Sequence, residues 1–141
     1  GELRTLRLPG PLGTPQLAAS QGVAGYRGGP EGLYVHLTGG SAWLRTDPAS
    51  GTVARPAPYL HEANARLVDW STAADGTRTD FRLQGHAPIV FSLANARGCQ
   101  VRADQRAIAP ERTAPATAGT DVLAYRLTHA AAQIQLQCPA R

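Results

Sequence analysis

The chain of 141 residues is 43% hydrophobic and 17% charged, a balance typical of one globular domain that is large enough to form its own core without bound metals. Its formal net charge is +4, and its 14 basic residues are all arginines that stand singly along the chain, without the dense or aromatic-interleaved basic patch of a nucleic-acid-binding protein. The apolar runs are too short to cross a bilayer, so we expect neither nucleic-acid binding nor membrane insertion.

The N-terminal part of the chain is predicted to contain short strands. Residues 4–8 form a strand candidate that is stopped by the Pro-Gly-Pro that follows, and residues 22–26 form a short edge strand or a glycine-rich turn. The glycine-rich residues 28–32 then reverse the chain. Residues 32–37 and 41–45 both alternate in polarity on either side of a Gly-Gly pair, so we expect these two strands to pair as a hairpin.

The middle of the chain is predicted to hold a second hairpin. Residues 46–58 are rich in Pro, Gly, Ser and Thr and are expected to form an exposed loop. Residues 66–71 resume a strand pattern, and Asp75-Gly76 supplies a turn. In residues 77–84, Thr and apolar side chains alternate with charged and amide side chains, so the buried face fixes the register of this hairpin.

The C-terminal part of the chain continues with short strands. Residues 89–93 and 99–103 are strand candidates, and residues 109–120, which contain two prolines, are expected to form a permissive loop. Residues 122–127 and 132–138 form the closing strands, and the last of them alternates apolar and amide side chains without interruption. No segment of useful length has a helical period.

The steady spacing of short strands between Gly and Pro turns determines the predicted fold class. It indicates an all-β protein with two antiparallel sheets packed face to face, a β-sandwich of jelly-roll-like type, with a β-barrel as the alternative. We expect residues 1–141 to form a single domain. Because the chain has no methionine and starts at Gly1, we further expect this domain to be excised from a larger exported protein.

The two cysteines are predicted to form a disulfide. Cys99 and Cys138 each lie in an alternating segment, and in both segments the sulfur shares a face with the apolar residues. Two thiols on the buried sides of neighbouring or facing strands can meet at bonding distance, and a pair of free buried thiols is the alternative. A disulfide places the domain in an oxidising compartment, so we expect it to be periplasmic or secreted.

The sequence contains no recognisable motif for catalysis, metal binding or cofactor binding. Its histidines are scattered singly, without the short spacing by which two imidazoles on one element bind a metal. The pair His61-Glu62 joins an imidazole and an acid, but neighbouring residues of an extended strand point to opposite faces. Asp69 and Asp80 lie on opposite arms of the second hairpin and are expected to balance nearby arginines. We therefore predict no catalytic residue, no metal, no cofactor and no enzymatic activity of this domain by itself.

Aromatic side chains are the best candidates for ligand contact. The flat face of a sugar ring packs against an indole or phenol ring while polar side chains bind its hydroxyl groups. In the hairpin expected at residues 32–45, one strand face combines an aromatic with an arginine and another combines an aromatic with a histidine, which would form an amphipathic platform; burial of the tryptophans in the core is the alternative. The candidate carbohydrate-binding residues are Tyr34, His36, Trp43, Arg45, Tyr59 and Trp70.

Three short segments and the cysteine pair resemble a known family. Residues 22–26 (Gly-Val-Ala-Gly-Tyr), 33–37 (Leu-Tyr-Val-His-Leu) and 81–86 (Phe-Arg-Leu-Gln-Gly-His) look like parts of the carboxy-terminal β-rich region of PelA-like proteins, which modify the Pel exopolysaccharide in the bacterial periplasm. Proteins of that family combine a glycoside hydrolase and a polysaccharide deacetylase with accessory modules, and their catalytic motifs lie in the other domains. This chain lacks the deacetylase Asp-Asp-Gly signature, so no catalytic residue is carried over.

The resemblance implies a non-catalytic accessory module of an exopolysaccharide-modifying protein. Such a module would contribute carbohydrate binding or packing between domains, and its partners would be a polysaccharide or neighbouring domains of the same protein. The alternative is a structural or protein-docking β-sandwich of an exported bacterial protein without affinity for carbohydrate. Exposed coplanar aromatic rings in a groove would favour the first function, whereas a flat apolar patch and buried tryptophans would favour the second.

Overall fold

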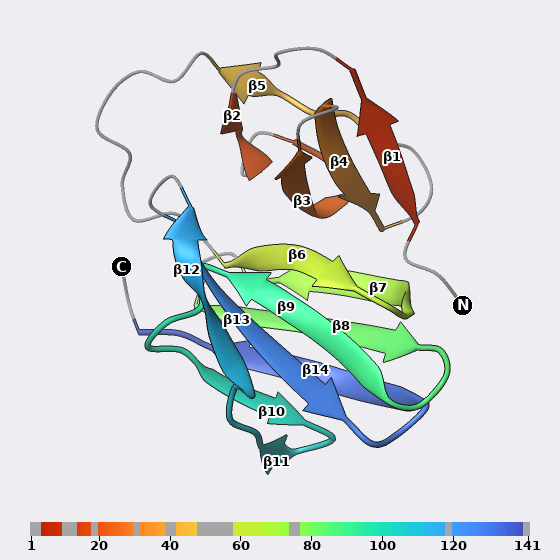
Figure 1. Ribbon diagram of the computed structural model, residues 1–141, viewed down its shortest axis with the longest axis vertical. Coiled ribbons are helices and arrows are strands. Elements are labelled where there is room, and N and C mark those ends of the chain that lie inside the picture. The colour runs from red at the N-terminus through yellow and green to blue at the C-terminus, as the bar shows by residue number, and fades with distance from the viewer. Residues whose placement is uncertain are drawn as a thin grey trace.

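The computed structural model describes residues 4–9, 14–17, 20–29, 32–38, 42–47, 58–73, 77–117 and 120–139. Its regular elements are β-strands, and the described residues contain no α-helix (Figure 1). None of the described segments is a helix of the length and apolar character that crossing a membrane requires. The strands are β1 (Thr5–Leu8), β2 (Thr14–Pro15), β3 (Val23–Gly29), β4 (Gly32–Leu37), β5 (Thr46–Asp47), β6 (Tyr59–Ala63), β7 (Arg66–Thr72), β8 (Arg78–Gln84), β9 (Ile89–Ala94), β10 (Gln100–Ala103), β11 (Arg106–Ala107), β12 (Arg112–Thr117), β13 (Thr120–Leu127) and β14 (Ala131–Gln137).

These strands form three larger antiparallel sheets and one two-stranded ribbon. The small sheet has the order β1-β4-β3, the five-stranded sheet β11-β10-β14-β8-β7 and the four-stranded sheet β12-β13-β9-β6, while β2 pairs with β5. The prediction of an all-β antiparallel protein is confirmed. Among the described strands, every sheet has two edge strands and none closes on itself, so the alternative of a barrel is wrong.

The five-stranded and four-stranded sheets share one hydrophobic core. In Figure 1 the four-stranded sheet lies in front of the five-stranded sheet, and the small sheet lies above both. Phe81 of β8 meets Phe91 of β9 edge to face with ring centroids 5.9 Å apart, and Phe91 stacks on Tyr125 of β13 at 5.1 Å. These rings connect the two sheets. The largest fully buried side chains of the two sheets are Tyr125, Phe81, Phe91, Leu60, Leu83, Ile89, Leu93, Ile134 and Leu136.

The small sheet contacts the larger sheets through a close approach of β3 to β6. Gly25 of β3 lies against the backbone of Leu60 in β6, where a side-chain carbon at position 25 would overlap the Leu60 carbonyl oxygen and lie 2.7 Å from the Leu60 nitrogen. Glycine permits this distance between two backbones because it has no Cβ. Beside the contact, Tyr26 and Tyr59 stack with ring centroids 4.5 Å apart.

The second predicted hairpin is confirmed. β7 and β8 pair antiparallel, with Trp70 opposite Phe81, and the apolar side of β8 faces the core. The predicted turn at residues 75–76 lies outside the described residues. The alternation along residues 77–84 identified this strand correctly because one of its faces is buried and the other is exposed.

The first predicted hairpin is wrong. Residues 32–37 form β4, but β4 pairs with β1 and β3 instead of residues 41–45. Gly29 stands opposite Gly32, so a short connection joins β3 to β4. Because β1 and β3 occupy the two sides of β4, no side of β4 remains for the residues that follow it. Within residues 42–45, the backbone of Trp43 instead forms a bridge to Gln21.

Two predicted loops also differ from the structure. Thr46–Asp47 pair with β2, and residues 48–57 of the loop predicted at 46–58 lie outside the described residues. Residues 112–117 of the loop predicted at 109–120 form β12, at the edge of the four-stranded sheet. An edge strand tolerates the proline in this segment because one side of its backbone needs no partner, and the register of β12 shifts between Ala114 and Thr117.

The predicted disulfide between Cys99 and Cys138 is confirmed. The two Cα atoms lie 4.2 Å apart, and Cys138 is buried as the alternating pattern required. The bond joins the end of β14 to the residue before β10, which is its neighbour in the five-stranded sheet. A structural disulfide is consistent with an oxidising compartment.

We expect Gly25→Ala to loosen the small sheet from the larger ones. Because the new methyl group would overlap the Leu60 backbone, the free energy of unfolding should fall by about 3 kcal/mol. Urea denaturation measures this change. Gly28→Ala on the same strand is the matched control, since nothing lies within 4 Å of a Cβ there, and its effect should stay within about 0.5 kcal/mol. Equal effects of the two substitutions would contradict the contact.

We expect the double variant Cys99→Ala/Cys138→Ala to lose about 4 kcal/mol of unfolding free energy, because the disulfide closes a loop with a sequence separation of 39 residues. Chemical denaturation of the oxidised protein and of the variant provides the measurement. Reductant should lower the midpoint of the native protein and leave that of the variant unchanged. A native protein that is insensitive to reductant would show that the bond does not stabilise the fold.

Candidate functional site

Four of the six residues predicted to contact carbohydrate lie on or near the small sheet, in different environments. Tyr34 is half-buried, and the guanidinium group of Arg27 lies over its ring, 4.4 Å from the centroid. His36 is buried, so it does not share an exposed surface with Tyr34. Trp43 is 55% exposed, and Arg45, two residues further along, is exposed as well.

The other two predicted residues are turned toward the interior. Tyr59 of β6 is buried against Tyr26. Trp70 of β7 is half-buried on the core side of its strand and stacks on Phe81, with ring centroids 4.9 Å apart. The six residues are thus divided between the small sheet, β6 and the core side of β7, and they do not form one exposed platform.

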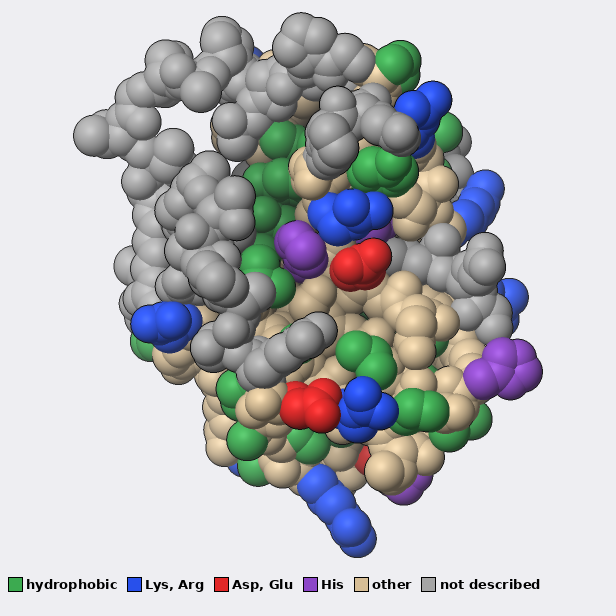
Figure 2. All heavy atoms as spheres, viewed as in Figure 1, with side chains coloured by type: hydrophobic (Ala, Val, Ile, Leu, Met, Phe, Trp, Pro, Cys, Tyr) green, Lys and Arg blue, Asp and Glu red, His purple; other side chains and the backbone are tan. Residues whose placement is uncertain are grey.

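A group of polar side chains lies where β3 and β4 meet β6 and β9, and Figure 2 shows basic, acidic and histidine side chains gathered between the small sheet and the larger sheets. Arg27 Nε lies 3.7 Å from Glu62 Oε1 and is buried without a hydrogen-bond partner among the described residues. We call this group the junction cluster. Its members are Arg27, Tyr34, His36, His61, Glu62 and Ser92.

A β-bulge in β6 brings two adjacent residues into the junction cluster. The register of β6 against β9 shifts between Leu60 and Glu62, so that His61 is an extra residue and Glu62 stands opposite Ser92. His61 Nδ1 lies 3.2 Å from Ser92 Oγ, while Glu62 pairs with Arg27. The expectation of strict alternation is wrong at this point because a bulge redirects side chains, and sequence alone gives no signal for it.

His36 is the buried centre of the junction cluster. Its Nε2–H donates to the carbonyl oxygen of His61, and its Nδ1 accepts a hydrogen bond from the Thr5 hydroxyl at 3.0 Å. Burial lowers the pKa of His36, and the hydrogen bond to His61 opposes this shift. Burial also lowers the pKa of His61, and the negative charge of Glu62 opposes that shift. Neutral imidazoles therefore connect β1, β4, β6 and β9.

The contacts of the junction cluster suit a structural connection between sheets better than a catalytic site. A serine next to an imidazole acts as a nucleophile when a third group orients the imidazole and backbone N–H groups bind the oxyanion. Here the Glu62 carboxylate lies beside Arg27, and Ser92 projects from the interior of β9, whose backbone pairs with strands on both sides. The cluster therefore supports a role in holding the small sheet in place.

The outward side of the five-stranded sheet is a second and larger polar region, which sequence analysis did not single out. Polar side chains alternate with core residues along β8, β10 and β14, and the register aligns them across strands, so that Gln137 stands between Gln100 and Arg78. We call this surface the polar face. Its residues are Arg78, Asp80, Arg82, Gln84, Gln100, Arg102, Gln133, Gln135 and Gln137.

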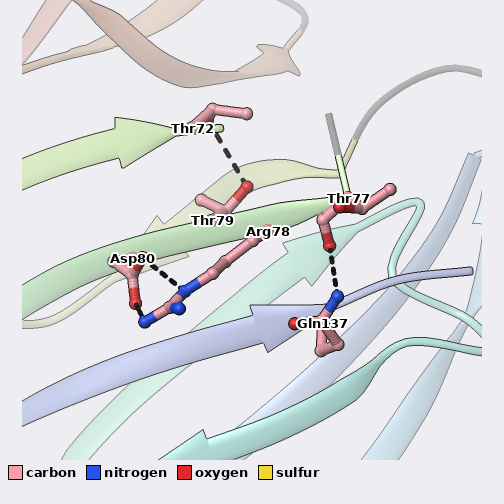
Figure 3. A network of polar contacts seen from close by, with 6 residues as sticks. All are labelled: Thr72, Thr77, Arg78, Thr79, Asp80 and Gln137. Carbon is pink, nitrogen blue, oxygen red and sulfur yellow. Dashed lines mark hydrogen bonds and ion pairs between the residues drawn. The ribbon is translucent and has the colours of Figure 1, made fainter. Parts of the chain in front are cut away.

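Local contacts hold parts of the polar face in place. Arg78 Nε lies 3.1 Å from Asp80 Oδ2, and Figure 3 shows these two side chains turned toward each other on β8. The amide of Gln137 donates to the backbone carbonyl of Thr77 at 3.5 Å. These contacts orient one end of the polar face and leave most of its polar atoms exposed to solvent.

Two open hollows of about 280 Å³ each lie on the polar face. Gln135 lines both hollows, which shows that they adjoin. The first hollow is lined by Arg78, Gln100, Arg102, Gln135, Leu136 and Gln137. The second hollow is lined by Asp104, Gln105, Gln133 and Gln135.

The second hollow is bordered by an unusual turn between β10 and β11. Asp104 and Gln105 both have positive φ angles, 49° and 70°, as a type I′ turn requires. Glycine is the favoured second residue of this turn, and glutamine is rare there. Asp104 fixes the turn to β14, because its Oδ1 accepts from the Gln133 N–H at 3.0 Å and its own N–H donates to the Gln133 carbonyl at 2.9 Å.

Comparison with known proteins gives no assignment for either region. No protein family matches the chain, and no curated protein and no solved structure matches it. Among the described residues, no group of three or more His, Cys, Asp or Glu could hold a metal ion. The resemblance to PelA-like proteins and the function that it implies therefore remain predictions.

We expect the stability of the protein to fall in acid because of the junction cluster. The folded pKa of His36 and of His61 is lowered below the unfolded value of 6.5, so their contribution to stability is complete above pH 6.5 and is lost as the pH falls through the lowered folded pKa. Thermal unfolding between about pH 7.5 and about pH 4.5 measures this dependence. The slope should be smaller in His36→Gln and unchanged in His86→Gln, which alters an exposed turn residue. Equal slopes in the native protein and His36→Gln would contradict the role of His36.

Proposed function

We propose that this chain is a non-catalytic carbohydrate-binding module of an exported bacterial protein and that the polar face is its binding surface. In this proposal the five-stranded and four-stranded sheets are the layers of a β-sandwich, and the disulfide reflects folding in the periplasm or outside the cell. The observation that supports it is the polar face, where amide and guanidinium side chains from three adjacent strands surround two adjoining hollows.

The chemistry of these side chains suits a polyhydroxylated ligand. An amide offers both donors and acceptors, and a guanidinium group offers five donors in a fixed plane, so together they match the hydroxyl groups of a sugar. A surface without a deep cavity also allows an extended polymer to lie across it. Recognition would then rest on hydrogen bonds to the sheet, in place of the aromatic platform expected from the sequence.

The turn at the second hollow also supports a binding function. Gln105 has a left-handed backbone conformation that costs about 1 kcal/mol for a residue other than glycine. Residues held in such conformations are concentrated at functional sites. In this proposal the glutamine is retained because its exposed amide contributes to ligand binding in the second hollow.

The proposed role agrees with the one implied by the resemblance to PelA-like proteins. A binding module linked to an exopolysaccharide-modifying enzyme would keep the polymer close to the catalytic domain and raise its effective concentration there. The polar face would then make the carbohydrate contact for which the sequence had suggested Tyr34, Trp43 and the other aromatic candidates.

A second candidate function is docking to a neighbouring domain through the small sheet. Leu6 is 51% exposed and Trp43 is 55% exposed, and these are two of the three large hydrophobic side chains exposed among the described residues. The indole Nε1 of Trp43 donates to Gln21 Oε1 at 3.2 Å, which orients the ring. Exposed apolar side chains of this size are typical of contact surfaces between proteins.

We expect oligosaccharide binding to map to the polar face in an NMR titration of the labelled protein, with the largest amide shifts in β8, β10 and β14. Gln135→Ala should weaken binding about tenfold, because Gln135 contributes to both hollows. Gln105→Gly should also weaken binding while the free energy of unfolding stays equal or rises, since glycine suits the turn. Shifts concentrated around Trp43 would favour the docking surface, and no shifts with any oligosaccharide would contradict the proposed function.

A further inference from the structure

We propose that the hollow between Arg78 and Arg102 binds the carboxylate group of an acidic sugar, and that the polar face recognises polysaccharides in which acidic residues adjoin neutral ones. This inference rests on the proposed carbohydrate-binding function and adds to it the chemical class of the ligand. The observation that supports it is that the two adjoining hollows are lined by side chains of different charge.

The first hollow has an excess of positive charge. Two arginines and three glutamines line it together with Leu136, and none of these described lining residues carries a carboxylate. The charge of Arg78 is balanced in part by Asp80, at 3.1 Å. Arg102 is exposed and forms no ion pair with another described residue, so its guanidinium group is open to an external anion.

The positions of the two arginines suit a shared anion. Arg78 lies on β8 and Arg102 lies on β10, and β14 runs between these strands. Neighbouring strands are about 4.8 Å apart, so both guanidinium groups can reach a ligand placed above β14. Guanidinium groups bind carboxylates through paired, charge-assisted hydrogen bonds, and the amide of Gln135 on β14 can bind a hydroxyl group of the same sugar.

The second hollow disfavours another acidic sugar at the adjoining position. The described residues that line it are Asp104, which supplies a carboxylate, and three glutamines, which supply amides, and none of them is basic. A ligand carboxylate placed there would be repelled by Asp104, whereas hydroxyl and acetamido groups can accept from the amides and donate to the carboxylate. An acidic residue in the first hollow and a neutral residue in the second therefore match the surface.

A nucleic acid would also carry negative charge, but the polar face lacks the other feature that single-stranded nucleic acids require. Bases are held by stacking on aromatic side chains, and none of the nine residues of the polar face is aromatic. Asp80 stands on β8 opposite Gln135, and its carboxylate also opposes a phosphate backbone that runs continuously across the face. An acidic polysaccharide fits both the charges and the amides.

Isothermal titration calorimetry can test this inference with three hexasaccharides and the intact protein. The probes are a hyaluronan fragment, which alternates acidic and neutral sugars, an oligogalacturonate, which is acidic throughout, and chitohexaose, which is neutral. We expect the hyaluronan fragment to bind about tenfold more tightly than either of the others. Arg102→Gln, which keeps an amide and removes the charge, should abolish this preference. Arg126→Gln is the matched control, because Arg126 is an exposed arginine on the four-stranded sheet that pairs with Glu111.

Each outcome has a defined consequence. Loss of the preference in Arg102→Gln, with no change in Arg126→Gln, would support the carboxylate site. Equal binding of all three probes, or a preference that survives Arg102→Gln, would overturn this inference and leave the carbohydrate-binding function intact. Binding of none of the probes or of other oligosaccharides would overturn the proposed function itself. Tighter binding of a single-stranded DNA oligonucleotide, with loss in Arg102→Gln, would overturn the choice of a polysaccharide.

Discussion

The aromatic contact between Phe81 and Phe91 determines which way the strands of both larger sheets face. The ring of Phe81 points from β8 toward the four-stranded sheet, and that of Phe91 points back from β9. Because side chains alternate along a strand, the neighbours of Phe81 at positions 80 and 82 must face outward. Ile134 of β14 stands opposite Phe81 and follows the same rule. The buried rings thus place the polar face on the outside of the five-stranded sheet.

The small sheet depends on a different constraint, the shape of the backbone at its contact with β6. Gly25 allows β3 to lie directly against Leu60, and the buried imidazole of His36 then donates to the backbone of His61 next to it. Polar contacts of this kind are sensitive to a single added methyl group or proton, whereas the core between the larger sheets is stabilised by many fully buried side chains. The two larger sheets are therefore held together by a well-packed core, whereas the small sheet is attached to them through a few contacts that tolerate little change in shape or protonation.

Features that depend on the alternation of side chains along one strand were predicted correctly from the sequence. Features that depend on pairing between distant segments were not. The strand at residues 77–84 and the disulfide were correct because parity identifies a buried face and places both sulfurs on it. The hairpin at residues 32–45 was wrong because glycine-rich stretches of sequence stand on both sides of residues 33–37, and the local pattern does not show which of them joins paired strands. The polar face was missed although its alternating amides are visible in the chain, because only the register between β8, β10 and β14 brings them together.

The junction cluster and the polar face differ in how many of their polar groups are exposed to a ligand. In the junction cluster the histidines are held by hydrogen bonds between strands, and the exposed Glu62 carboxylate lies beside Arg27. On the polar face the backbone is fixed by sheet pairing while most side-chain donors and acceptors remain exposed. A rigid strand scaffold lowers the entropy that binding must overcome, and the free donors supply new hydrogen bonds to a ligand. We therefore assign the proposed binding function to the polar face, where sheet pairing fixes the positions and most polar side chains remain exposed.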